Sequence, residues 1–158
     1  MSKLLILGGT SDAVALARQA ADMDHLEVTY SLAGVTSNPN LPDCPVRQGG
    51  FDGAEGLAGF LKAQGFDMLL DATHPFASQI AANAAQACEK AGVAHLKYLR
   101  PPWQPQAGDE WLEVGDMEAA ADSLAIFDPR VFLSVGVRDL TAFTGLTENW
   151  FLVRLMEK

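Results

Sequence analysis

The stretch Lys3-Leu-Leu-Ile-Leu-Gly-Gly-Thr-Ser-Asp-Ala-Val-Ala-Leu-Ala17 decides the fold that we predict for this chain. Its apolar run at residues 4–7 has no polar alternation, which is typical of a strand buried on both faces of a parallel sheet. Two glycines end the run, and from Ala13 onward apolar residues recur at helical spacing. The polar residues at 10–12 provide candidate caps and an acid for a first helical turn. The stretch therefore predicts a strand, a tight glycine turn and a helix.

A turn of this kind directs backbone N–H groups and the positive end of a helix at one point, where an anionic phosphate is stabilised. Gly8 and Gly9 would let a ligand approach the backbone, and the hydroxyls of Thr10 and Ser11 could add hydrogen bonds. The match to the dinucleotide fingerprint G-x-G-x-x-G/A is incomplete, because Thr10 replaces the second glycine and Ala13 fills the last position. Two readings stay open: a phosphate site, or a plain strand-turn-helix joint that binds nothing.

Composition and charge exclude several classes of protein. The chain has 158 residues, of which 49% are hydrophobic, and a formal net charge of −9. The length suits one domain, or one domain and part of another, while the acidic balance argues against general nucleic-acid binding. Neither a membrane span nor a signal or transit peptide is evident. Cys44 and Cys88 have no paired spacing, which is typical of reduced thiols. We expect a cytoplasmic protein without nucleic-acid or membrane partners.

The rest of the chain continues the alternation of strands and helices. Strands are predicted at 26–32, 46–48, 66–70 and 93–99, and helices at 54–64 and 75–91. This order predicts an α/β fold with a doubly wound parallel sheet. A last strand at 111–114 and an amphipathic helix at 117–126 would complete a first domain, residues 1–128. Residues 129–158 would begin a second, incomplete α/β domain.

Polar and glycine-rich segments follow the predicted strands, at the sheet edge where open α/β folds bind ligands. Ser31 lies near the end of the second strand, in a segment without the acid or arginine that typically reads an adenosine ribose. Residues 49–51, Gly-Gly-Phe, form a second glycine-rich turn. The hydroxyl of Ser31 could hydrogen-bond a phosphate, or the segment is simply a strand that runs into a loop.

The most unusual segment is Asp71-Ala-Thr-His-Pro-Phe-Ala77, directly after a predicted strand. Pro75 is tolerated at the first helical position, so we expect a helix from about residue 75 with Thr73 or His74 at its cap. His74 is either a helix-start residue bonded to nearby backbone or a site residue facing the cleft. Its side chain ionises near neutrality, which makes it a candidate proton donor.

Basic and aromatic residues are the remaining candidates. Arg47, Lys97, Arg100 and Arg138 could pair with carboxylates of a ligand, although each could equally be solvated surface. Trp103 offers a flat apolar face. The three histidines lack metal-ligand spacing, and no nucleophile motif is present.

Five motifs together resemble the precorrin-6A reductase family, including its cobalt-precorrin-6A members. They occur in one order and at matching separations: Leu7-Gly-Gly-Thr-Ser-Asp-Ala13, Ser31-Leu-Ala-Gly34, Gly49-Gly-Phe51, Asp71-Ala-Thr-His-Pro-Phe-Ala77 and Arg100-Pro-Pro-Trp103. The segments at 131–136, 138–143 and 151–155 resemble the opening of the second domain of that family.

The resemblance implies a Rossmann-like domain followed by a second α/β domain, with hydride transfer from NADPH, or alternatively NADH, into the precorrin-6A macrocycle. The product would be precorrin-6B, in cobalamin biosynthesis, and the protein a monomer or weak homo-oligomer. The expected cofactor-binding residues are Gly8, Gly9, Thr10, Ser11, Ser31, Gly50, Phe51 and Thr73. The expected tetrapyrrole-binding residues are His74, Pro75, Phe76, Arg100, Trp103 and Arg138, with His74 as catalytic candidate and no metal ligand.

Two departures from the family pattern bear on these expectations. Family members often carry Arg where this chain has Val35, which leaves Ser31 and Thr36 as hydroxyl groups for a 2′-phosphate. The family's second domain continues beyond the elements recognisable here, so we expect a truncated second domain.

Two other functions stay open. One is a nucleotide-binding fragment or regulatory domain without chemistry. The other is a different Rossmann-type oxidoreductase acting on a small sugar or acid. Its short-chain type is disfavoured, because neither Tyr30 nor Tyr98 has Lys four residues on.

Overall fold

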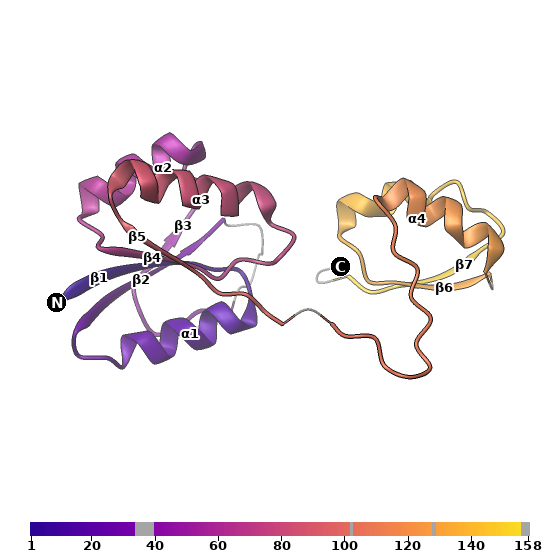
Figure 1. Cartoon of the computed structure of the whole chain (residues 1–158), viewed down its shortest axis with the longest axis horizontal. Coiled ribbons are helices and arrows are strands. Elements are labelled where there is room, and N and C mark those ends of the chain that lie inside the picture. The colour runs from indigo at the N-terminus through magenta and orange to yellow at the C-terminus, as the bar shows by residue number, and fades with distance from the viewer. Residues whose placement is uncertain (34–39, 102, 128, 156–158) are drawn as a thin grey trace. The chain divides into compact units, whose positions relative to one another are not determined.

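The structure is a computed structural model that describes residues 1–33, 40–101, 103–127 and 129–155. The chain divides into two compact units, Met1–Pro102 and Trp103–Lys158. Figure 1 shows helices on both faces of the sheet in the first unit, and a helix on one face of a smaller sheet in the second. None of the described helices has the length and apolar character that crossing a membrane requires.

The first unit is built on a five-stranded parallel sheet with the order β3-β2-β1-β4-β5. Its strands are β1 (Ser2–Leu7), β2 (Leu26–Leu32), β3 (Val46–Gln48), β4 (Met68–Asp71) and β5 (Ala94–Lys97). The order reverses on either side of β1, and sheets of this type bind ligands outside the carboxyl ends of the strands at such a point. The predicted doubly wound parallel sheet is confirmed.

Three helices cover this sheet. Helix α1 (Ser11–Ala21) packs on one face, and α2 (Gly53–Gln64) and α3 (Ser78–Ala91) pack on the other (Figure 1). The side chains of β1 alternate between the two layers: Leu4 and Ile6 join the core beneath α1, whereas Leu5 and Leu7 join the core beneath α2 and α3. Both faces of β1 are therefore buried, which is why its sequence is continuously apolar.

The start of α3 differs from the prediction. The N–H of Ala77 donates to the carbonyl of His74 at 2.8 Å, which closes a turn with Pro75 in its second position. Pro75 therefore belongs to a turn, and α3 begins at Ser78 with Ala77 as N-cap. The predicted cap at Thr73 or His74 was wrong. The fixed φ of proline suits the second position of a β-turn as well as it suits a first helical turn.

The second unit has a small core of its own. Strands β6 (Arg130–Leu133) and β7 (Trp150–Val153) form a parallel pair, joined through the 3-10 helix η2 (Val137–Phe143). Helix α4 (Met117–Ser123), continued by the 3-10 turn η1 (Leu124–Ile126), completes the unit. The buried core residues are Ala121, Leu133 and Phe143.

Two predictions for this region need correction. Residues 111–114 were expected to form a strand but belong to no described strand, because no neighbouring strand pairs with them. The division after residue 102 lies earlier than the predicted domain boundary at 128, and the reason is that α4 buries Ala121 against Leu133 and Phe143. Helix α4 therefore belongs with residues 129–155 rather than with the larger sheet.

Candidate functional site

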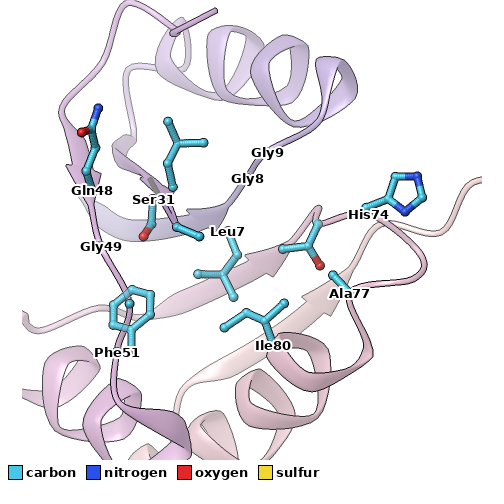
Figure 2. Close-up of a pocket in the computed structure, with 14 residues that line it drawn as sticks. Leu7, Gly8, Gly9, Ser31, Gln48, Gly49, Phe51, His74, Ala77 and Ile80 are labelled. Atoms are coloured by element: carbon cyan, nitrogen blue, oxygen red, sulfur yellow. The ribbon is translucent and has the colours of Figure 1, made fainter. Parts of the chain in front are cut away.

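A pocket of about 330 Å³ lies at the carboxyl edge of the larger sheet, within the first unit (Figure 2). The ends of β1, β2 and β3 and the segment after β4 contribute to its wall. The lining residues are Leu7, Gly8, Gly9, Ser31, Leu32, Ala33, Gln48, Gly49, Gly50, Phe51, Thr73, His74, Ala77 and Ile80. The structure therefore brings together many of the residues predicted for a nucleotide site, from four separate segments of the sequence.

Other predicted site residues lie elsewhere. Thr10 and Ser11 stand at the start of α1 beside the pocket rather than in its wall. Phe76 is 90% exposed in the turn before α3. Trp103 and Arg138 belong to the second unit, where Trp103 is 88% exposed.

The glycine turn is held in shape by a side chain that the sequence analysis did not select, Tyr30 of β2. A Cβ on Gly8 would stand 2.1 Å from the ring carbon Cζ of Tyr30, so only glycine fits there. Gly9 has a φ of +115°, and its N–H donates to the Tyr30 hydroxyl at 3.0 Å. Burial of Tyr30 raises the pKa of its phenol. Its aromatic character could have suggested a core residue of β2, but not a partner for the turn.

Thr10, one of the three candidate caps, caps α1 through a hydroxyl whose proton is already donated within the protein. Its Oγ1 accepts from the N–H of Ala13 at 3.1 Å and donates to the carbonyl of Ala72 at 3.1 Å. A hydroxyl has one proton, so this one has none left for a phosphate. This differs from our expectation that the Thr10 hydroxyl would contribute to phosphate binding.

The first helical turn nevertheless offers donors. Within the part of the chain that the structure describes, the N–H groups of Thr10, Ser11 and Asp12 have no hydrogen-bond acceptor. These are the orphan donors that begin every α-helix, and the helix dipole adds a partial positive charge. Beside the pocket they form a site suited to an anion.

Arg47 organises the second glycine turn. Its guanidinium donates to the carbonyls of Gly49 and Gly50, at 2.5 Å each, and lies 3.8 Å from the centre of the Phe51 ring. A Cβ on Gly56 would meet the Phe51 carbonyl oxygen at 1.7 Å, which explains a glycine inside α2. Arg47 therefore shapes the pocket wall, in place of the anchoring role for a ligand carboxylate that was one of its two predicted roles.

The segment after β4 supplies the opposite wall. Asp71 is 1% exposed, and its Oδ1 accepts from the N–H of Thr73 at 3.1 Å and from the Thr73 hydroxyl at 2.6 Å. His74 lies at the rim, and its ring projects away from the other lining side chains (Figure 2). Its Nδ1 accepts from the N–H of Phe76 at 3.3 Å.

Arg100 is already partnered. Its Nε lies 2.5 Å from Oδ2 of Asp12, in the first turn of α1. The two residues are 88 positions apart in the sequence, so this ion pair connects the segment after β5 to the helix start beside the pocket. The charge of Asp12, which would otherwise oppose an anion at these N–H groups, is thereby balanced.

Together these features describe a pocket for a ligand rather than a self-sufficient catalytic centre. Its wall is mostly apolar, the polar side chains among its described lining residues are Ser31, Gln48, Thr73 and His74, and the open N–H groups of the first turn of α1 lie beside it. The described residues that line it include no carboxylate, lysine or cysteine. Among the described residues, no group of three or more His, Cys, Asp or Glu could hold a metal ion.

Comparisons with known proteins show the family to which the chain is similar. The family model described as "Precorrin-6x reductase CbiJ/CobK" matches residues 3–158. The precorrin-6A reductase of Rhodococcus erythropolis is 43% identical over 157 residues, which cover 99% of this chain and 63% of that protein. The cobalt-precorrin-6A reductase of Salmonella typhimurium is 34% identical, over 97% of this chain and 59% of that protein.

Solved structures are similar as well. A structure described as "CobK precorrin-6A reductase" superposes with a TM-score of 0.89 and 42% identity, over 100% of this chain and 62% of that one. A saccharopine dehydrogenase from Saccharomyces cerevisiae, with a TM-score of 0.51 and 14% identity over 64% of this chain and 23% of that one, shares the fold alone. The chain thus spans about three fifths of the length of the reductases that it matches.

Proposed function

The chain belongs to the precorrin-6x reductase family, and on that premise we propose that it forms the nicotinamide-binding part of a precorrin-6A reductase. The reaction that we propose is hydride transfer from NADPH into the precorrin-6A macrocycle, giving precorrin-6B in cobalamin biosynthesis. Relatives named for the cobalt-free and for the cobalt-containing substrate both match this chain, so either macrocycle is a candidate.

The observation that carries the proposal is the glycine turn at the point where the strand order reverses. Gly8 leaves no room for a side chain, and the N–H groups of Thr10, Ser11 and Asp12 are open beside the pocket. These features fit the pyrophosphate of a dinucleotide. The adenosine half would lie towards Ser31 and the turn at residues 49–51, and the nicotinamide half towards Thr73.

In the proposed reaction, the cofactor supplies the hydride and the protein binds and orients the cofactor. When bound, the nicotinamide ring supplies the hydride. The residues of the chain bind the cofactor and exclude water through the apolar side chains of Leu7, Phe51 and Ile80. His74 lines the pocket and an imidazole ring can donate a proton, so we assign it the proton that accompanies the hydride.

The macrocycle would meet exposed residues. Pro75 and Phe76 form an exposed turn next to His74 and offer apolar surface to a planar ring system. We keep Arg100 and Arg138 as candidates to pair with the carboxylates of the macrocycle, and Trp103 as a candidate to stack on its flat face. Arg100 already forms an ion pair with Asp12.

The preference for NADPH over NADH is a separate part of the proposal. The described lining near β2 and β3 carries Ser31 and Gln48 but no cation, and Arg47 is engaged by the turn. Val35 and Thr36 lie outside the described residues. We propose NADPH, with NADH as the alternative, and expect a smaller preference than an arginine at the 2′-phosphate would give.

Titration of the chain with NADPH and with NADH, followed by nicotinamide fluorescence, tests the cofactor site. Saturable binding is expected, and a folded chain that binds neither would contradict the proposal. Incubation with precorrin-6A and NADPH then tests the reaction. Binding without turnover would favour a non-catalytic nucleotide-binding role. That role is the alternative because the chain spans about three fifths of the length of the reductases that it matches.

A further inference from the structure

The hydrogen bonds between Asp71 and Thr73 fix the direction in which the hydroxyl proton of Thr73 points. The Thr73 hydroxyl donates to Asp71 Oδ1 at 2.6 Å, and the Thr73 N–H donates to the same oxygen at 3.1 Å. A carboxylate oxygen accepts, so the single hydroxyl proton of Thr73 points at Asp71. Thr73 lines the pocket, and its hydroxyl therefore has no proton left for a ligand there, only lone pairs.

Such an oxygen selects the kind of ligand group that it contacts. Phosphate oxygens accept hydrogen bonds and cannot donate one to the Thr73 oxygen, which is itself limited to accepting. Thr73 is therefore unsuited to the pyrophosphate. Hydroxyl groups and amide N–H groups of a ligand can donate a hydrogen bond to this oxygen. The Thr73 oxygen is therefore complementary to a ribose hydroxyl or a carboxamide.

Asp71 exerts this effect without reaching the ligand itself. It is 1% exposed, and its Oδ2 is buried without a hydrogen-bond partner among the described residues. Its carbonyl accepts from the N–H of Tyr98 at 2.9 Å, and the next residue, Ala72, is bonded to Leu7 and Thr10. The carboxyl group is thus fixed by its surroundings, and its unpartnered oxygen is a cost that an ordinary turn would not require.

We propose that Asp71 is a positioning residue that sets the Thr73 hydroxyl as an acceptor for a hydrogen-bond donor on the nicotinamide half of the cofactor. The inference rests on the proposed function. Thr73 follows β4, on the opposite side of β1 from Ser31 in β2, so it faces the half of a dinucleotide away from the adenosine. The donor is a hydroxyl of the second ribose or the carboxamide.

The test compares three ligands by calorimetric titration of the whole chain: ADP, ADP-ribose and NADPH. ADP has no second ribose, and ADP-ribose has that ribose without the carboxamide. Thr73→Val should weaken ADP-ribose and NADPH by about tenfold and leave ADP unchanged. Thr73→Ser should restore both. A loss for NADPH alone would identify the carboxamide as the donor.

A second set of variants isolates Asp71. Asp71→Leu removes the acceptor at similar size and should weaken ADP-ribose as Thr73→Val does, with no further loss in the double variant. Asp71→Asn retains an acceptor oxygen and should keep most of the affinity. Thr73→Val keeps the proposal testable if Asp71→Leu fails to fold.

The ratio of the ADP-ribose to the ADP dissociation constant separates positioning from general damage, because a distorted pocket would weaken both ligands. Equal losses for ADP and ADP-ribose, or no loss in Thr73→Val, would overturn the inference while leaving the proposed function intact. Wild-type chain that binds none of the three ligands would instead contradict the proposed function, and the inference with it.

Discussion

The backbone N–H of Gly9 donates to the buried hydroxyl of Tyr30 at 3.0 Å. This bond ties the glycine turn after β1 to the neighbouring strand β2, and the Tyr30 ring occupies the space that a side chain on Gly8 would need. The shape of the turn is therefore a property of the packed sheet as well as of its glycines. The first two predictions follow from the ways in which this turn is held.

Gly8→Ala should destabilise the first unit by about 1–3 kcal/mol, because the new Cβ would overlap the Tyr30 ring. It should also abolish NADPH binding by displacing the turn. Gly59→Ala is the matched control: it lies in α2 with nothing within 4 Å of the new Cβ, and should stabilise by about 0.5–1 kcal/mol. Urea denaturation and NADPH titration measure both effects. Equal stability of the two variants would refute the steric argument.

Thr10→Val should cost about 1–2 kcal/mol of stability, because it removes the cap of α1 and the bond to Ala72. NADPH affinity should fall as well, since the open N–H groups of the first turn lose their fixed position. Thr10→Ser keeps the hydroxyl and should behave like the wild type in thermal melts and titrations. If Thr10→Val lowered affinity without lowering stability, direct contact of the hydroxyl with the cofactor would be the better explanation.

Arg100→Gln should weaken nucleotide binding by about three- to fivefold at low salt, because it leaves the Asp12 carboxylate unpaired beside the proposed phosphate site. Asp12→Asn should bind as tightly as the wild type or more tightly. In the double variant the loss should disappear, and raising the salt concentration should shrink every difference. A loss in Arg100→Gln that persisted in the double variant would indicate that Arg100 contacts the nucleotide directly.

The stability of the first unit should decrease as the pH rises above 9. Burial raises the pKa of Cys44 and of Cys88 above 9.0, and that of Tyr30 above 10.0. The unfolded chain therefore releases these protons first, and stability present below the unfolded pKa values is lost as the pH climbs towards the folded ones. Urea denaturation at about pH 8 and about pH 10.5 should show the decrease.

Two variants check that assignment. Cys88→Ala and Tyr30→Phe each remove one of the groups whose pKa is raised, so each should reduce the dependence of unfolding free energy on pH, whatever its effect on stability near neutrality. An unchanged slope in both variants would assign the alkaline loss to other groups.

Much of the first unit could be predicted from local patterns. Strands β2 and β3 have the predicted bounds, and α2 ends at residue 64 as predicted, directly before Gly65, whose φ is +68°. These features depend on residues close in sequence: continuous apolar runs, helical spacing and glycine at a left-handed position. The amphipathic character predicted for residues 117–126 agrees with the structure, because Met117, Ala120, Ala121 and Leu124 pack in the core of the second unit.

The predictions that failed were those in which local signals allow two outcomes. Proline begins a helix or occupies a turn with the same φ, and only the hydrogen bond from Ala77 to His74 selects the turn. Residues 111–114 contain residues that favour strands, but a strand exists only where a partner pairs with it. The sequence of helix α4 shows an apolar face but does not indicate which of the two units that face packs against.

By itself, the sequence determined the parallel sheet, the glycine turn and the segments that form the pocket, because burial and backbone conformation depend on patterns of residues that are close in the sequence. Only the tertiary structure decided what each polar group does. Thr10 reaches Ala72 across 62 positions, and Arg100 reaches Asp12 across 88. Such contacts depend on the register and order of strands, which place distant residues together, so no local pattern could show which hydroxyls and cations are already engaged.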